Sequence, residues 1–328
     1  MSRYWRSLAI RVGGSALMLA LLLHFLPFQK LAAAVKSVSP LLGLSLIACY
    51  LSVHLLGAAK WRILINLAGA RLTYIQAIRC YYLGLFGNIF LPSLVGGDFV
   101  RAGLAFRLSR NKPAIVLGSL IDRVQDMIGL LTVAGIGALM LPRALDNHSR
   151  RVFWVVSGLL IVSGLAALGA VYATPVRRFP FKVRRIMARV RSGIRSTYVK
   201  PHRVLLCFCL GITIQTCLVG INFVLAEALG LHVAFYVWLF AWPLSKLSGL
   251  VPVTQGGIGV REVALVALMS PFGAPAVLTA AVGLVFEAIL ITGGLIGGLL
   301  SVTIRYFSIP DTPGQDKHGR ERTIPETI

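Results

Sequence analysis

Acidic side chains are scarce in this sequence, with 11 against 33 basic ones, and charged residues of both signs make up only 13% of it. A soluble domain carries about 25% charged residues. Hydrophobic residues make up 57% of the chain, more than a water-soluble fold of this size could hide. This composition excludes an ordinary soluble enzyme or binding module and predicts an integral membrane protein.

Several motifs that carry chemistry are absent. The five cysteines form no Cys-x-x-Cys pair, so we interpret them as packing residues and predict no metal and no cofactor. No Gly-x-x-x-x-Gly-Lys-[Ser/Thr] sequence occurs, which argues against ATP hydrolysis. Zinc-finger spacing and RNA-binding motifs are also missing, so the net charge of +22 does not indicate a nucleic-acid partner.

Apolar runs divide the chain into eight segments. The first could be a secretory signal peptide, but the many later segments favour an uncleaved helix. Two shorter amphipathic stretches, at 94–106 and 256–270, are too short to cross a membrane alone. The eight segments lie near residues 8–26, 41–59, 73–91, 114–141, 152–173, 204–229, 233–251 and 275–304.

The basic residues between these runs predict the orientation. Lysine and arginine concentrate at the N-terminus, in segments 60–79, 107–112 and 174–203, and in the C-terminal tail, which we place in the cytoplasm. All of these basic segments lie on the cytoplasmic side only if 73–91 and 94–106 form a hairpin that enters the membrane from the cytoplasm and returns to the cytoplasm. By the same logic, 233–251 and 256–270 enter from the other side.

We therefore predict an all-α polytopic membrane protein with six full crossings and two re-entrant helical hairpins. Eight full crossings is the alternative, and segment 73–91 decides between them. Residues 1–308 form one transmembrane domain, with repeat cores at 41–141 and 204–304. The basic loop 174–203 is expected to bind anionic inner-leaflet lipids, and the polar tail 309–328 to be disordered.

An internal repeat is the most informative feature. Residues 91–101 and 251–262 share a frame of proline, three residues, a glycine pair, two residues and Val-Arg, at a constant offset of 160. Broken helices at matching positions in two halves indicate a transporter site, and opposite entry of the hairpins indicates an inverted repeat. The matched residues are Pro92 and Pro252, Gly96-Gly97 and Gly256-Gly257, and Arg101 and Arg261.

The chemistry of each copy suits a phosphate head group. Proline ends the incoming helix, and paired glycines allow positive φ and close backbone approach. The next helix then begins with free amides, which attract an anion, and carries the arginine near its start. The other interpretation is a tight turn between helices, with the arginine reaching to the interface. The duplication, with Asp98 and Glu262 beside the arginines, favours a binding site.

Other charged residues lie inside apolar segments, where they are functional candidates. Asp122, Arg123 and Asp126 form either a structural ion pair or part of a charge relay, and Lys246 joins them as a candidate. Glu287 stands alone in an apolar run, so it is a proton carrier or the partner of a buried arginine.

The run Gly87-Asn88-Ile89-Phe90-Leu91-Pro92, followed by Gly96-Gly97-Asp98, Arg101 and Asp122-Arg123, resembles the membrane region of lysylphosphatidylglycerol synthases, as does the later run 256–262. The resemblance covers about residues 8–305 and implies a flippase-like domain that passes aminoacylated phosphatidylglycerol between leaflets. It adds Asn88 to the candidate substrate-binding residues. A soluble synthase domain is not expected here, so the resemblance implies a stand-alone member in the bacterial inner membrane.

The leading hypothesis is accordingly a lipid transporter and not an enzyme. Its substrate is a phospholipid, aminoacylated or not, or a related envelope lipid. One alternative is a membrane-embedded transferase acting on a polyprenyl or phospholipid substrate. Another is a non-transporting subunit that partners enzymes of envelope-lipid or hopanoid biosynthesis.

Overall fold

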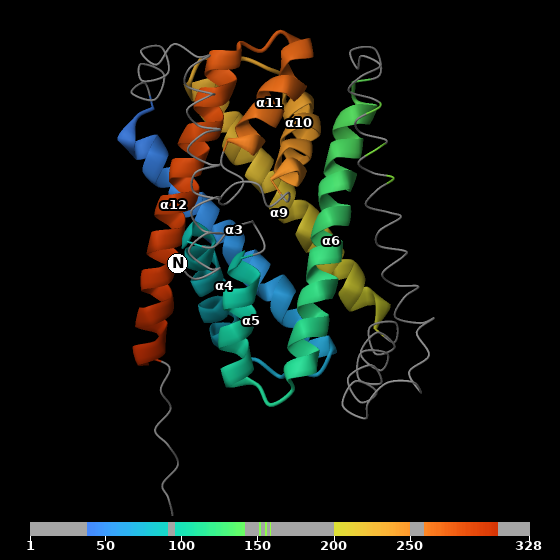
Figure 1. The fold of residues 1–328 in the computed structure, drawn as a ribbon, viewed down its shortest axis with the longest axis vertical. Helices are drawn as coiled ribbons and strands as arrows, with labels where there is room; N and C mark the ends of the chain where they lie inside the picture. The colour runs from blue at the N-terminus through green and yellow to red at the C-terminus, as the bar shows by residue number, and fades with distance from the viewer. Residues whose placement is uncertain are drawn as a thin grey trace, which may run out of the picture.

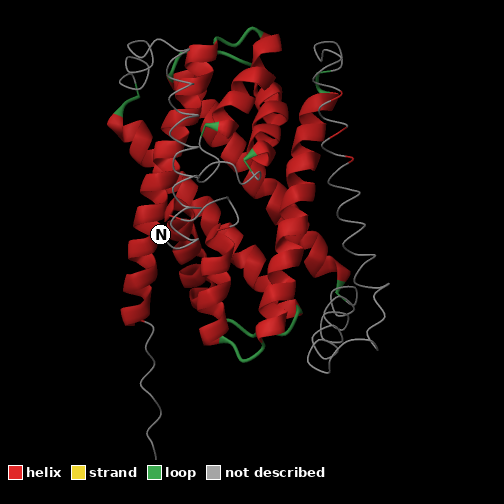
Figure 2. Ribbon diagram, in the orientation of Figure 1, coloured by secondary structure: helices red, strands yellow, loops and turns green. Residues whose placement is uncertain are grey.

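A computed structural model describes residues 38–90, 96–141, 200–249 and 259–307, with residues 151, 155 and 158. These residues are helical, with no strand among them, which confirms the predicted all-α class (Figure 2). The predicted spans at 8–26 and 152–173 lie wholly or largely outside the described residues. So do most of the loop 174–203 and the tail 309–328.

Four long helices run the length of the described bundle (Figure 1). A helix of 28 residues is about 42 Å long, more than the ~30 Å of a bilayer's hydrocarbon core. Three are both long and apolar enough to cross a membrane, and α6 is as long but carries more charge. They are α3 (Pro40–Leu67), α6 (Lys112–Leu139), α9 (Pro201–Ala228) and α12 (Ala276–Phe307).

Four shorter helices form two packed pairs. The pair α4 and α5 lies in the lower half of Figure 1, and the pair α10 and α11 lies in the upper half. At about 1.5 Å per residue, each of the four is shorter than a membrane's hydrocarbon core. They are α4 (Tyr74–Phe90), α5 (Gly96–Leu108), α10 (Phe235–Ser248) and α11 (Val260–Met269), which the 3-10 turn η3 (Ser270–Phe272) follows.

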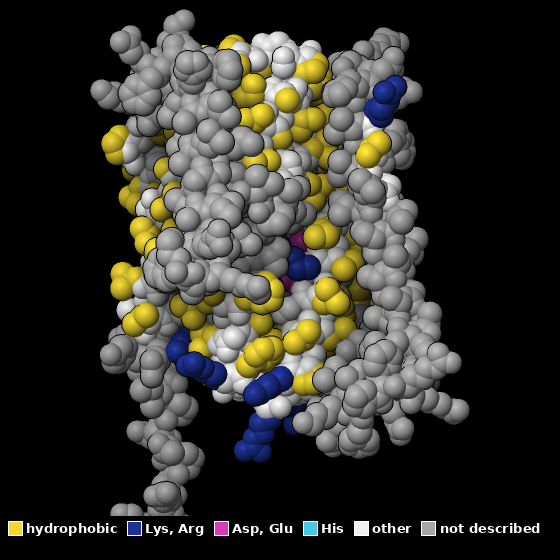
Figure 3. Space-filling view, viewed as in Figure 1, with side chains coloured by type: hydrophobic (Ala, Val, Ile, Leu, Met, Phe, Trp, Pro, Cys, Tyr) yellow, Lys and Arg dark blue, Asp and Glu magenta, His cyan; other side chains and the backbone are white. Residues whose placement is uncertain are grey.

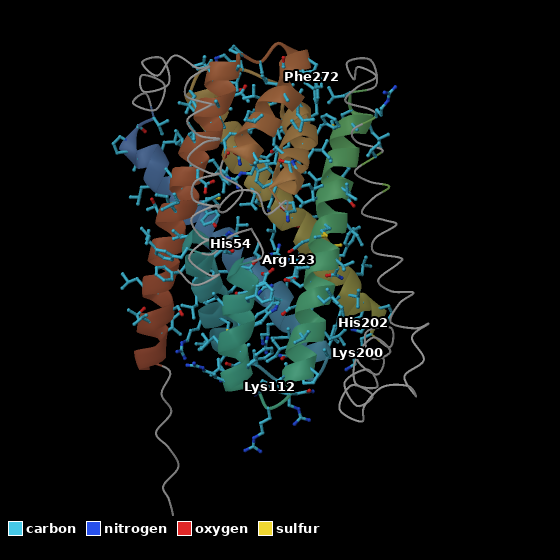
Figure 4. The ribbon with its side chains drawn as sticks, viewed as in Figure 1. His54, Lys112, Arg123, Lys200, His202 and Phe272 are labelled. Carbon is cyan, nitrogen blue, oxygen red and sulfur yellow. The ribbon has the colours of Figure 1, made fainter. Side chains whose placement is uncertain are left out.

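Several connections and helix ends that carry basic residues lie at the same end of the bundle. The α5–α6 connection and the C-terminal end of α12 lie at the lower end of the bundle (Figure 1). Lys112 and Lys200, at the starts of α6 and α9, lie towards that end too, whereas Phe272 lies at the upper end (Figure 4). The α5–α6 connection, the starts of α6 and α9 and the C-terminal end of α12 therefore share one end of the molecule.

The helices from α3 to α6 form a first group and those from α9 to α12 a second, and the two groups match in local detail. Helices α3 and α9 both have 28 residues and both begin with proline. Each is followed by a glycine with positive φ, Gly69 at 101° and Gly230 at 77°. The next residue donates to a carbonyl five residues earlier in both cases, Ala70 to Ile65 and Leu231 to Ala226, each at 2.9 Å. This is the glycine-terminated helix end of a Schellman motif, used twice at an offset of 161 residues.

The two groups also pack across each other. Helix α12 packs on α4, and α6 packs on α10. Glycines of α12 make the first contact close, because a Cβ on Gly294 would lie 3.1 Å from the Leu85 carbonyl oxygen, and one on Gly298 would lie 2.6 Å from the Phe86 ring. These glycines are packing positions, as their G-x-x-x-G spacing predicts.

The outer surface of the bundle is apolar. Large hydrophobic side chains such as Leu41, Phe99 and Leu139 are more than two-thirds exposed. Lysine and arginine side chains gather at the lower end of the view in Figure 3. An apolar belt above a basic end is the surface of a multi-pass membrane protein.

Candidate functional site

A cavity of about 210 Å³ lies among the helices, and every described α-helix contributes to its lining. Basic and acidic side chains are visible near mid-height between hydrophobic ones in Figure 3, and Arg123 and His54 lie near mid-height in Figure 4. Its charged lining residues are Lys60, Asp98, Arg101, Arg123, Asp126, Lys246, Arg261 and Glu287. Both predicted arginines therefore face one cavity, although 160 residues separate them.

Arg101, on α5, is held by two carboxylates. Its Nη2 lies 3.0 Å from an oxygen of Asp98 and 3.1 Å from one of Asp122, and its side chain is 5% exposed. The guanidinium also lies over the rings of Trp61 and Tyr81, 4.7 and 5.0 Å from their centroids. The predicted pairing of Asp98 with Arg101 is present, and Asp122 joins it from α6.

Two further cations complete this lower cluster. Arg123 Nε donates to Asp98, so that one carboxylate serves two arginines. Lys60 Nζ lies 3.1 Å from Asp122 Oδ1 and also donates to Asp126. Asp122 and Asp126, one helical turn apart on α6, thus share the lysine. The cluster contains three cations and three carboxylates, so its formal charges cancel.

Lys60 corrects one sequence interpretation. Its position in segment 60–79 suggested an exposed orientation residue, but α3 continues to Leu67 and buries the Lys60 side chain, which is 2% exposed. A signal for this was present in the sequence. Tyr50, His54, Gly57 and Lys60 recur at helical spacing within an apolar run, and all four line the cavity.

A second cluster comes from α11 and α12. Arg261 Nη2 donates to Glu287 Oε2 and lies 3.4 Å from Glu262 Oε1. Glu287 is therefore the partner of a buried arginine, one of the two roles its sequence position allowed. Glu262 Oε2 also accepts from the backbone N–H of Gly259, at 2.6 Å, at the start of α11. That helix start favours a negative charge, so Glu262 is stabilised twice.

Lys246, on α10, has different partners. Its Nζ donates to Gln215 Oε1 at 3.0 Å and lies 5.0 Å from the ring centroid of Trp242. Within the described residues, it forms no ion pair with a carboxylate. It shares the cavity with the acid Asp126, which has the strongest electrostatic effect on it, and with the cations Arg123, Arg261 and Lys60.

His54 lines the cavity from α3 and is 9% exposed. Its ring packs against Tyr50 and Tyr81, with centroid separations of 4.3 and 5.7 Å. Among the residues that the structure describes, neither ring nitrogen has a hydrogen-bond partner. Buried polar groups are normally paired, so an unpaired histidine beside a cavity is a candidate ligand contact. Sequence reasoning did not select this residue.

The glycine-rich turns are described in part. Pro92, Pro252, Gly256 and Gly257 lie outside the described residues. Gly96 and Gly97 are buried at the start of α5, and a Cβ on Gly97 would lie 2.2 Å from the Gly84 carbonyl oxygen, so the predicted close backbone approach is present. Asn88 Oδ1 accepts from the Gly97 N–H at 2.7 Å, which satisfies one amide that was expected to be free for a ligand.

These features define a class: a multi-pass helical membrane protein in which α3, α5, α6, α10, α11 and α12 place charged side chains around a cavity within the bundle. Comparison with known families narrows the class. The sequence profile described as "Lysylphosphatidylglycerol synthase TM region" matches residues 8–298, and the chain belongs to this family. The resemblance drawn from the motifs is thereby confirmed. No curated protein matches the chain.

Proposed function

We propose that this chain is a lipid transporter that carries the head group of a phospholipid or a related envelope lipid through the central cavity. One observation carries the proposal. Arg101 from α5 and Arg261 from α11 face the same cavity, in a bundle whose outer surface is apolar. Ionisable groups inside a membrane are costly and mark substrate pathways. Membership of a family named for a phospholipid synthase's membrane region supports a lipid as the substrate.

The proposed topology has two re-entrant hairpins, α4–α5 from one side and α10–α11 from the other. The short lengths of these helices and their positions in opposite halves of the bundle support it (Figure 1). The matched ends of α3 and α9, and the reciprocal packing of α12 on α4 and α6 on α10, support an inverted repeat. In such a repeat, the binding site lies near the bilayer midplane, between the halves.

A head group could reach this cavity from the side. Arg123 and Asp126 line it, and their side chains remain 28% and 24% exposed. Acyl chains would stay against the apolar surface while the polar head group exchanged its hydration for the cavity's charged groups. This arrangement needs no catalytic base and no metal. We therefore favour transport over a transferase reaction.

Translocation in proteoliposomes tests the proposal. Labelled phosphatidylglycerol, lysyl-phosphatidylglycerol, phosphatidylethanolamine and an uncharged glycolipid are compared in vesicles with and without the protein. We expect an anionic or aminoacylated phospholipid to cross faster with protein present. Replacement of Met127, which lines the cavity, by tryptophan should slow transport at least about fivefold by filling it.

The matched control is Ile128→Trp. Ile128 is the next residue on α6, is 47% exposed and does not line the cavity, so transport should stay within about twofold. Equal loss in both variants would show that transport does not pass through the cavity. If no lipid crosses but a modified lipid accumulates, the transferase hypothesis replaces this one.

A further inference from the structure

The two arginines are poorly placed to be the main anion-binding groups. Arg101 lies beside Asp98 and Asp122, and Arg261 lies beside Glu262 and Glu287. A phosphate that approached either guanidinium would also meet two carboxylates. Like charges repel strongly where water is scarce. The Nη2 group of each arginine, which binds these acids, is in addition no longer free for a ligand, and Arg101 keeps only Nε as a buried donor without a partner among the described residues.

Lys246 lacks this obstacle. An ammonium group has three donors, and among the described residues the Nζ of Lys246 donates one hydrogen bond, to the neutral Gln215. Three cations, Arg123, Arg261 and Lys60, share the cavity with this lysine, and the acid that acts on it most strongly, Asp126, is already paired with Lys60. A buried cation with positive neighbours is stabilised when an anion binds beside it.

His54 provides a second, independent indication of a ligand. Within the described part of the chain both ring nitrogens are buried and unpaired, and Lys246 and Arg101 line the same cavity as the ring. A neutral imidazole offers one donor and one acceptor. A phosphate oxygen can accept from the donor, and a hydroxyl of the same head group can donate to the other nitrogen. The pair Lys246 and His54 therefore matches a phosphate ester that carries a hydroxyl group.

We infer that Lys246, with Gln215 and His54, forms the subsite that binds the phosphate of the head group, while Arg101 and Arg261 hold the helices in place through ion pairs. The inference rests on the proposed function, because it names the part of the same cavity that recognises the lipid. Gln215 fixes the position of the ammonium group. The ring of Trp242 lies 5.0 Å from the ammonium group, and both residues line the cavity that the anion would enter.

Equilibrium binding of fluorescent phosphatidylglycerol to the full chain in phosphatidylcholine nanodiscs tests the inference. Lys246→Gln removes the charge and can keep a hydrogen bond to Gln215. It should raise Kd about tenfold or more, as expected for a lost charge-assisted hydrogen bond. Lys112→Gln is the charge-matched control, because Lys112 is exposed at the end of the bundle, and its Kd should stay within about twofold.

His54→Phe is the second variant. The histidine has no hydrogen bond to another described residue, so the phenylalanine variant should fold normally and raise Kd about threefold or more. It therefore keeps the test valid if Lys246→Gln does not fold. Wild-type binding in both folded variants would overturn the inference and return the phosphate to the arginines.

Competition by glycerol 3-phosphate distinguishes the two sources of the phosphate. If it displaces the fluorescent lipid from wild type, the subsite accepts a free phosphate ester. If only the lipid binds, and Lys246→Gln weakens it, the subsite is specific for a membrane-anchored head group. Both results support the inference. If wild type binds no phospholipid, the proposed function itself fails, which is a different result from wild-type-like binding by the variants.

Discussion

Replacement of Arg261 by glutamine tests whether the buried arginines stabilise the fold. Arg261 is 7% exposed and lies between Glu262 and Glu287, which are 1% and 13% exposed. Removal of the cation would leave two buried carboxylates beside each other. Breaking a buried ion pair costs about 3–5 kcal/mol, and protonation of an orphaned carboxylate limits the loss. We expect Arg261→Gln to lower the free energy of unfolding by that amount.

Removal of the acidic partner should lower the free energy of unfolding by less than removal of the arginine. Glu287→Gln leaves Arg261 with Glu262, so the loss should be about 1–2 kcal/mol, close to one charge-assisted hydrogen bond. The double variant has no carboxylate at position 287 that would be left without its arginine. Its Glu262 still accepts from the Gly259 N–H at the start of α11. Its loss should match that of Glu287→Gln alone. The coupling energy between the two sites then has the size of the Arg261→Gln loss, about 3–5 kcal/mol.

Unfolding by sodium dodecyl sulfate in mixed micelles, followed by tryptophan fluorescence, measures these free energies. All four proteins are compared at one pH and one lipid-to-detergent ratio. Additive losses in the double variant would refute the reasoning, because they would show that Arg261 and Glu287 stabilise the fold independently. An Arg261→Gln variant as stable as wild type, but defective in lipid binding, would make the arginine a ligand contact instead.

Two further predictions use the same unfolding measurement. Gly137→Ala should lower the free energy of unfolding by about 1–3 kcal/mol, because the new Cβ would lie 2.5 Å from a backbone nitrogen of α10. Gly220→Ala is the control. Its new Cβ would have nothing within 4 Å, so the free energy of unfolding should change by less than about 1 kcal/mol. Lys60→Met should lose about 3–5 kcal/mol, because Asp122 and Asp126 would lose their shared cation. An unchanged midpoint for either Gly137→Ala or Lys60→Met would contradict the packing or the ion pair on which it rests.

Much of the fold could be predicted from hydrophobic run length. The apolar segment at 204–229 corresponds to α9 at Pro201–Ala228, and that at 114–141 corresponds to α6 at Lys112–Leu139. The largest error is at α3, predicted to end at 59 and observed to end at Leu67. A run-length criterion stops at the first lysine, but the helix continues because Asp122 and Asp126 neutralise Lys60 inside the bundle. Tertiary pairing of this kind cannot be read from one segment alone.

The charged residues of the candidate site other than Lys60 were among the sequence candidates, whereas Lys60, His54 and Gln215 were not. Asp98 and Arg101 are close in sequence, so their pairing followed from helical geometry. The contact between Arg101 and Asp122 depends on how α5 packs against α6, which residue spacing does not specify. His54 and Gln215 were overlooked for another reason. Neutral polar side chains within apolar runs resemble ordinary packing residues until a structure shows which of them faces a cavity.

Charge is balanced in the buried region around the cavity and unbalanced in the rest of the chain, and the membrane environment explains both features. Five of the 11 acidic residues lie in this one region, with five cations, so its formal charge is zero and the whole net charge of +22 lies elsewhere. Hydrocarbon favours cancellation of buried charge, and anionic membrane surfaces favour an unbalanced basic exterior. Within the balanced region, the acids are shared among the other four cations and Lys246 is paired with none. Loss of one of those four cations should therefore destabilise the fold. Loss of Lys246 should instead weaken ligand binding with little change in stability. The unfolding and binding measurements together separate these two outcomes.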